Sequence, residues 1–155
     1  MRALLKKLET AFGSAVQIRS FGGSEGLIVE IDPKLIIEIC AWVRMEESFR
    51  LDFLETLSVF ESRGKLHFTL FLRSLPIGHF IAMRTSLETP ADTAHLNFPS
   101  LSRIWPQAIA YENELSPLFG IRFIDAVPAK VLKNYGEFTG FPLRKSYTWG
   151  RQVEP

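Results

Sequence analysis

Apolar residues recur every three or four positions through residues 100–120, the most strongly patterned stretch of the chain. That spacing is the period of an α-helix with one buried face. Ser100 can cap the start of such a helix with its hydroxyl, and Gly120 can end it in the left-handed conformation. Pro106 and Pro117 each remove a backbone donor, so we expect a kinked helix or a break into shorter helices.

The rest of the chain alternates between helical and strand periods. Residues 66–74 form the clearest strand pattern, and the middle of this strand is apolar on both faces, which is typical of a central strand or of one that a partner covers. Asp32 followed by Pro33 is a pattern that starts helices. We expect helices at 2–12 and 33–45, strands at 15–20, 27–31, 57–61, 66–74 and 79–86, a helical turn just before the third strand, a loop at 87–97, an extended piece at 121–123 and a helical turn at 128–134.

These elements predict an α+β fold of two layers. The sheet is expected to be antiparallel, with about four strands and with the helices packed on one face. From about residue 136 the chain has no regular period but is rich in aromatic and basic residues, so we interpret it as an irregular docking tail.

Composition and charge narrow the classes of protein. Of 155 residues, 46% are hydrophobic and 23% charged, which suits one domain spanning residues 1–155. A formal net charge of +1 argues against a nucleic-acid-binding module. No stretch approaches the roughly 20 apolar residues of a membrane span, and the N-terminus lacks a signal-peptide pattern, so we expect a cytoplasmic chain. The 13 phenylalanines suggest that part of the apolar surface faces a partner.

Residues that could carry chemistry are few. The three histidines lie far apart and have no companion metal ligands at a workable spacing. Cys40, the single cysteine, lies on an apolar helical stripe and is interpreted as a buried hydrophobe. Glu112 and Glu114 are two apart, so on a helix they point about 200° away from each other and make a poor acid–base pair. Ion pairs or caps suit these two carboxylates better, but a small stand-alone enzyme that uses them stays an alternative.

One ordered set of motifs resembles a known family. It consists of Trp105-Pro106, Tyr111-Glu112-x-Glu114, Leu118-Phe119-Gly120-Ile121 and Gly140-x-Pro142-Leu143-Arg144-Lys145-x-Tyr147. The set resembles the 30-kDa subunit, also called the C subunit, of respiratory complex I, the NADH:quinone oxidoreductase. The resemblance runs from about residue 33 to residue 147, and membrane-bound [NiFe] hydrogenase complexes contain homologous subunits.

The resemblance implies a structural role. A member of this family would bind no cofactor itself, and NAD, FMN, iron–sulfur clusters and quinone would belong to other subunits. It would pack on the 49-kDa subunit, also called the D subunit, or on a hydrogenase-large-subunit-like protein. The arm that contains these subunits would lie on the cytoplasmic face of the inner membrane, and this chain would touch the membrane only through the complex.

Family-motif residues are then the candidates for the partner interface. The resemblance implies that Glu112, Glu114 and the basic pair Arg144–Lys145, which we expect to be exposed, set the orientation of the subunit. Gly120 is expected to serve backbone conformation alone. The full set is Tyr111, Glu112, Glu114, Phe119, Gly120, Phe141, Pro142, Leu143, Arg144, Lys145 and Tyr147, in which Phe119, Phe141 and Leu143 would support packing.

Overall fold

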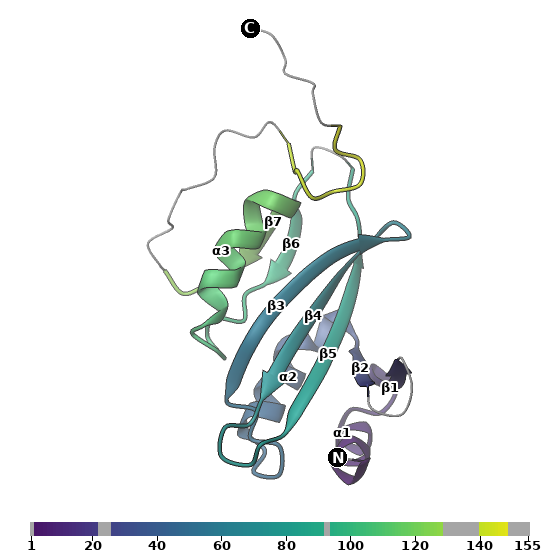
Figure 1. Cartoon of the computed structure of the whole chain (residues 1–155), viewed down its shortest axis with the longest axis vertical. Coiled ribbons are helices and arrows are strands. Elements are labelled where there is room, and N and C mark those ends of the chain that lie inside the picture. The colour runs from purple at the N-terminus through teal and green to yellow at the C-terminus, as the bar shows by residue number, and fades with distance from the viewer. Residues whose placement is uncertain (1, 22–25, 92–93, 129–139, 149–155) are drawn as a thin grey trace, which may run out of the picture.

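A mixed sheet of five strands forms the centre of the molecule in the computed structural model, which describes residues 2–21, 26–91, 94–128 and 140–148 (Figure 1). The strands lie in the order β1-β2-β5-β4-β3, and a second sheet pairs β6 with β7. The elements are α1 (Arg2–Phe12), β1 (Val16–Phe21), β2 (Gly26–Ile31), α2 (Ile36–Met45), β3 (Phe53–Ser62), β4 (Lys65–Arg73), β5 (Phe80–Glu88), β6 (Leu96–Pro99), α3 (Ala108–Phe119) and β7 (Ile121–Ile124), with 3-10 turns at Gly13–Ala15 and Pro33–Leu35.

The α+β class is confirmed, but the sheet differs from the predicted antiparallel sheet of about four strands. It has five strands, and β2 runs parallel to β5 while the other neighbours are antiparallel. The reason is the crossover through α2, which returns the chain so that β3 starts in the same direction as β2. After the β3–β4–β5 meander, β5 again has the direction of β2 and pairs with it.

The two faces of the main sheet differ. One face is buried, and α2 lies behind it in Figure 1. Every second residue of β4 is fully buried on this face, namely Leu66, Phe68, Leu70 and Leu72. Leu5 and Leu8 of α1 belong to the same core. Helix α3 packs beside the edge strand β3, and its buried residues Ala108 and Phe119 belong to the same core.

The predicted long helix begins later than expected. Residues 100–107 form turns, and α3 starts only at Ala108, so Ser100 does not cap a helix. The apolar side chains before it still face the core: Trp105 is fully buried, and its indole N–H donates to the Leu51 carbonyl at 2.9 Å. Because a turn can bury residues at the same spacing as a helix, the period alone placed the helix start too early.

Two further local predictions need correction. The helical turn expected before the third strand lies earlier than predicted, at residues 46–50, where the Arg50 N–H donates to the Glu46 carbonyl at 2.8 Å. Strand β3 already begins at Phe53 and pairs with β4 along its length, with a bulge between Leu54 and Thr56. The expected loop 87–97 contains the start of β6, and the predicted extended piece 121–123 is its parallel partner β7. The helical turn predicted at 128–134 lies almost wholly outside the described residues.

Helix ends follow the expected chemistry. Asp32 accepts a hydrogen bond from the Lys34 N–H at 2.8 Å, so it caps the 3-10 turn that leads into α2. Gly120 has φ of 64° and ends α3 in the left-handed conformation, as predicted.

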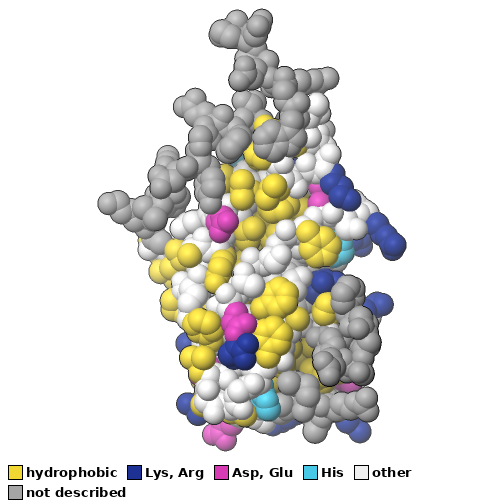
Figure 2. Space-filling view, in the orientation of Figure 1, with side chains coloured by type: hydrophobic (Ala, Val, Ile, Leu, Met, Phe, Trp, Pro, Cys, Tyr) yellow, Lys and Arg dark blue, Asp and Glu magenta, His cyan; other side chains and the backbone are white. Residues whose placement is uncertain are grey.

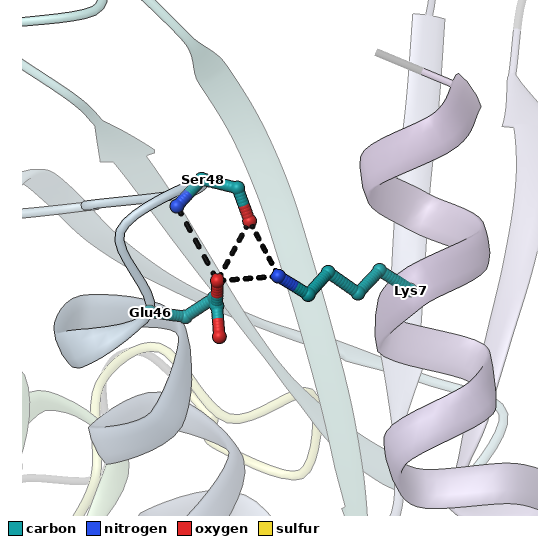
Figure 3. A network of polar contacts seen from close by, with 3 residues as sticks. All are labelled: Lys7, Glu46 and Ser48. Carbon is teal, nitrogen blue, oxygen red and sulfur yellow. Dashed lines mark hydrogen bonds and ion pairs between the residues drawn. The ribbon is translucent and has the colours of Figure 1, made fainter.

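A polar cluster joins the two N-terminal helices at the surface (Figure 3). The Lys7 ammonium of α1 donates to Glu46 at 2.5 Å, and the Ser48 hydroxyl donates to the same carboxylate at 2.8 Å. The hydrogen bonds from Lys7 and then Ser48 lower the pKa of Glu46. The cluster therefore fastens α1 to the loop that follows α2.

Candidate functional site

The family-motif residues gather where the C-terminal segment crosses the end of α3. The Leu143 N–H donates to the Leu118 carbonyl at 3.0 Å, and the Lys145 N–H donates to the Glu61 carboxylate of β3 at 2.7 Å. Figure 1 shows this segment, residues 140–148, passing over the end of α3 that leads into β7. Motifs that lie far apart in the sequence are thus brought into one site.

Glu112 lies at the centre of a buried polar network. Only 4% of the residue is exposed, and its carboxylate accepts from the Ser100 hydroxyl and from the Leu101 N–H, both at 2.7 Å. The Ser100 hydroxyl also lies 2.7 Å from that of Ser102, which accepts from the Val127 N–H at 2.9 Å. The network ties α3 to the turns before it and to the chain after β7, so Glu112 stabilises this domain instead of facing a partner.

Burial sets the protonation of Glu112. Its pKa is raised above the ordinary value of 4.5 because burial disfavours the carboxylate, although the bonds from Ser100 and Leu101 oppose the shift. Among the described residues the hydrogen-bond partners of this carboxylate are a hydroxyl and a backbone amide, in place of the ion pair that the sequence suggested.

We expect Glu112→Gln to change how stability depends on pH. In the wild type, unfolded Glu112 loses its proton near 4.5, whereas the folded residue retains it to higher pH, so this group makes stability fall as pH rises through that window. The neutral amide removes this contribution. Urea unfolding of both proteins from about pH 4 to pH 7 measures the difference. Glu114→Gln, on an exposed residue, is the control, and parallel wild-type and Glu112→Gln curves would contradict the prediction.

Arg144 is buried, so the prediction of an exposed Arg144–Lys145 pair was wrong for this residue. Its hydrogen bonds join separate segments of the chain, and we call this set of contacts the Arg144 clasp. Only 3% of the residue is exposed. Its guanidinium donates to the Phe119 carbonyl at 2.8 Å, to the Ala94 carbonyl at 2.8 Å and to the Ala91 carbonyl at 3.2 Å. Lys145 alone is exposed. Backbone carbonyls at the end of a helix attract a cation, and the turn at 140–147 aims Arg144 at them.

Phe141 and Gly120 fit each other closely. A Cβ atom on Gly120 would overlap the Phe141 ring, so Gly120 serves this close approach as well as the left-handed conformation. The same ring lies 4.4 Å from the Arg144 guanidinium and 5.1 Å, centroid to centroid, from His95. Phe141 therefore supports packing within the domain.

The other motif residues divide between the domain and the surface. Tyr111 donates its hydroxyl hydrogen to the Glu55 carbonyl of β3, and Phe119 and Pro142 are buried. Glu114 is exposed, on the other side of α3 from Glu112, so the two do not form an acid–base pair. Leu143 is 49% exposed and Tyr147 is half-buried. The exposed members are the ones that can meet a partner.

Two further observations concern chemistry. Among the described residues, no three or more of His, Cys, Asp and Glu are grouped so that they could hold a metal ion. Cys40 is fully buried, and burial raises the pKa of its thiol, which keeps the sulfur protonated.

No described helix is long and apolar enough to cross a membrane.

Sequence reasoning missed Ser100 and Ser102 as partners of Glu112, since a helix-capping role accounted for Ser100. The apolar middle of both faces of strand 66–74 did indicate the surface on the far side of the main sheet from α2. On that face His67 and Phe71 of β4 are only partly covered by the chain.

The fold and the site together define a small α+β domain whose motif residues hold its C-terminal segment in place. The chain belongs to the family of the 30-kDa subunit of respiratory-chain NADH dehydrogenase, whose sequence model matches residues 29–153. The resemblance seen in the motifs is thus confirmed over most of the chain.

Relatives support the same family. The NADH-quinone oxidoreductase C subunit of Roseiflexus sp. (strain RS-1) is 26% identical over 156 residues, covering 96% of this chain and 84% of the relative. The corresponding C subunit of Hyphomonas neptunium is 36% identical over 77 residues, covering 49% of this chain and 35% of the relative.

Solved structures share the fold. The trypsin-resistant fragment of Nqo5 matches with a TM-score of 0.64 at 23% identity, covering 83% of this chain and 100% of the fragment. A chain in the structure of an archaeal membrane-bound sulfane sulfur reductase, a respiratory membrane complex, matches with a TM-score of 0.67 at 14% identity, covering 81% of this chain and 71% of that one. At these identities the likeness concerns the fold alone.

Proposed function

We propose that this chain is a non-catalytic structural subunit in the hydrophilic arm of a complex-I-like NADH:quinone oxidoreductase. It packs on the 49-kDa subunit and supports electron transfer from NADH to quinone, while NAD, FMN, iron–sulfur clusters and quinone bind to other subunits. The observation that carries this proposal is the match of 96% of the chain to the C subunit of an NADH-quinone oxidoreductase.

The 49-kDa subunit as the neighbour is supported by a second kind of relative. The protein of Acinetobacter baylyi is named as a joint C/D subunit of NADH-quinone oxidoreductase; it is 27% identical over 157 residues, and the match covers only 25% of it. A name that joins C and D in one polypeptide suggests that the two parts work side by side. Where they are separate chains, a stable contact between them is the corresponding arrangement.

The site agrees with a structural role. Glu112 and Arg144, the residues best suited to acid–base or anion chemistry, are occupied by contacts within the domain. We further propose that the chain lies at the cytoplasmic face of the inner membrane and meets the membrane through the complex.

An alternative is the equivalent subunit of a membrane-bound [NiFe] hydrogenase-type complex. The observation in its favour is that the same fold occurs in a respiratory membrane complex that is named for sulfane sulfur reduction. A stand-alone enzyme that uses Glu112 and Glu114 is the less favoured alternative, because Glu112 is buried and Glu114 is exposed.

Purification of the tagged chain from its native membranes in mild detergent, with mass spectrometry of the co-purifying proteins, tests the proposal. We expect a protein of the 49-kDa type together with iron–sulfur and NADH-binding subunits. A large subunit with nickel-ligating cysteines would support the hydrogenase alternative instead. Recovery of the tagged chain alone, from membranes that retain NADH:quinone activity, would overturn both.

A further inference from the structure

The face of the main sheet opposite α2 carries a band of aromatic and basic side chains. We call it the open sheet face. Figure 2, in the orientation of Figure 1, shows hydrophobic side chains gathered over β3, β4 and β5 on this side. Its members, from three neighbouring strands, are Phe60, His67, Phe71, Arg73, Phe80 and Arg84.

Two aromatic pairs organise the open sheet face. Phe60 and His67 stack with ring centroids 4.8 Å apart and an angle of 15° between the rings. Phe71 and Phe80 stack at 6.1 Å and 22°. Phe60 is 39% exposed and Phe80 is 41% exposed. Stacked rings are held in one arrangement, so binding a partner here orders few new side chains.

Each aromatic pair has an arginine over it. The Arg73 guanidinium lies 5.2 Å from the centre of the Phe80 ring and also pairs with the Glu55 carboxylate. The Arg84 guanidinium lies 5.4 Å from the centre of the Phe60 ring, and its Nε–H donates to the Thr69 hydroxyl at 3.2 Å. Within the described part of the chain, no carboxylate forms an ion pair with Arg84, whereas Arg19, Lys65 and Arg73 on the same sheet each have one.

The open sheet face therefore presents one unneutralised guanidinium among aromatic rings. A guanidinium offers a planar fork of donors that fits a carboxylate, and the Phe60 ring and the Thr69 hydroxyl help to hold that of Arg84 in place. Binding an anionic membrane surface generally requires a cluster of about four to eight basic residues, which this mixed face lacks. The surface thus matches an apolar protein surface that contains a carboxylate.

We propose that the open sheet face is the docking surface for the neighbouring 49-kDa subunit. A carboxylate of that partner binds Arg84, and apolar side chains of the partner pack on Phe60 and Phe80. This assignment rests on the proposed function, since it concerns how the chain joins its complex. It moves the main contact from the charged motif residues, of which Glu112 and Arg144 are buried, to the exposed side of the sheet.

Thiol labelling tests the location directly. Ser58 is exposed and is the cross-strand partner of Thr69, so Ser58→Cys places a thiol on the open sheet face. Ile37→Cys, on a residue of α2 that is 40% exposed, is the control, and the native Cys40 is buried and adds no background. We expect maleimide to label both variants in the free chain. In the purified complex, labelling should fall at least about tenfold at Ser58→Cys and stay unchanged at Ile37→Cys. Equal labelling of Ser58→Cys in both states would overturn the proposal.

Charge reversal tests the chemistry of the contact. Arg84→Glu is expected to reduce recovery of the neighbouring subunit at least about tenfold, because two like charges then face each other in a buried contact. Lys6→Glu, an equal charge change on an exposed residue of α1, should leave recovery within about twofold. Phe80→Ser and Ile37→Ser make a second matched pair, and thermal melting of each free variant verifies that it is folded.

The outcomes separate the two proposals. If the wild-type chain recovers no neighbouring subunit, the proposed function fails. If the wild type recovers one and Arg84→Glu and Phe80→Ser recover it equally well, the proposed function stands and the docking surface is wrong.

Discussion

Arg144→Ala is expected to lower the free energy of unfolding by about 3–5 kcal/mol, enough to unfold a domain of ordinary stability in part of the population. The substitution removes a buried guanidinium that donates to the carbonyls of Phe119, Ala91 and Ala94. Hydrogen bonds from a charged group contribute about 1.5–3 kcal/mol each, and the buried carbonyls would lose these donors. The end of α3 would no longer be joined to Ala91 and Ala94.

Lys145→Ala is the matched control, since the neighbouring basic side chain is exposed. It should change the free energy of unfolding by less than about 0.5 kcal/mol. Urea unfolding of the isolated chain, followed by circular dichroism, measures both variants. Equal midpoints for Arg144→Ala and Lys145→Ala would show that the clasp does not stabilise the domain, and loss of assembly without loss of stability would return Arg144 to the partner interface.

Gly120→Ala is expected to cost about 2–5 kcal/mol, for two separate reasons. The φ of 64° strains any residue with a Cβ atom, at about 1–2 kcal/mol. The added methyl group also overlaps the Phe141 ring, and overpacking of this kind costs about 1–3 kcal/mol. Moving Phe141 would in turn disturb the Arg144 guanidinium that lies against it.

The chain contains a control that isolates the first cost. Gly13 has φ of 54°, and a Cβ atom placed there would meet nothing within 4 Å. Gly13→Ala should therefore show the conformational strain alone, and the double variant Gly120→Ala with Phe141→Ala should recover part of the packing cost. Thermal and urea unfolding of the wild type and these three variants measure both costs. If Gly120→Ala and Gly13→Ala were equally destabilised, the Phe141 contact would have no energetic weight.

The clasp changes how the family motifs are understood. A buried carboxylate and a buried guanidinium in a short irregular segment indicate a role in holding the chain together, even where the sequence suggests a charged surface. In this molecule Glu112 holds the start of α3 and Arg144 holds its end. The C-terminal segment is thereby part of the folded domain as far as Thr148, and it leaves Leu143 and Lys145 exposed.

Local features of the fold could be predicted from the sequence because neighbouring residues decide them. The α1 helix, the alternating strand β4 and the left-handed Gly120 follow from side-chain period and from the conformational freedom of glycine. The family could also be inferred, since several motifs in the correct order are a stronger indication than any one of them.

The pairing of distant segments was decided only by the tertiary structure. Whether β5 lies beside β2, whether residues 100–107 are helix or turn, and whether Glu112 and Arg144 are buried all depend on contacts between residues far apart in the chain. Charge in the sequence predicts exposure only on average, because burial of a charged group becomes favourable once enough partners surround it. For Arg144 those partners are carbonyls from positions 91, 94 and 119, which no local pattern around the residue contains.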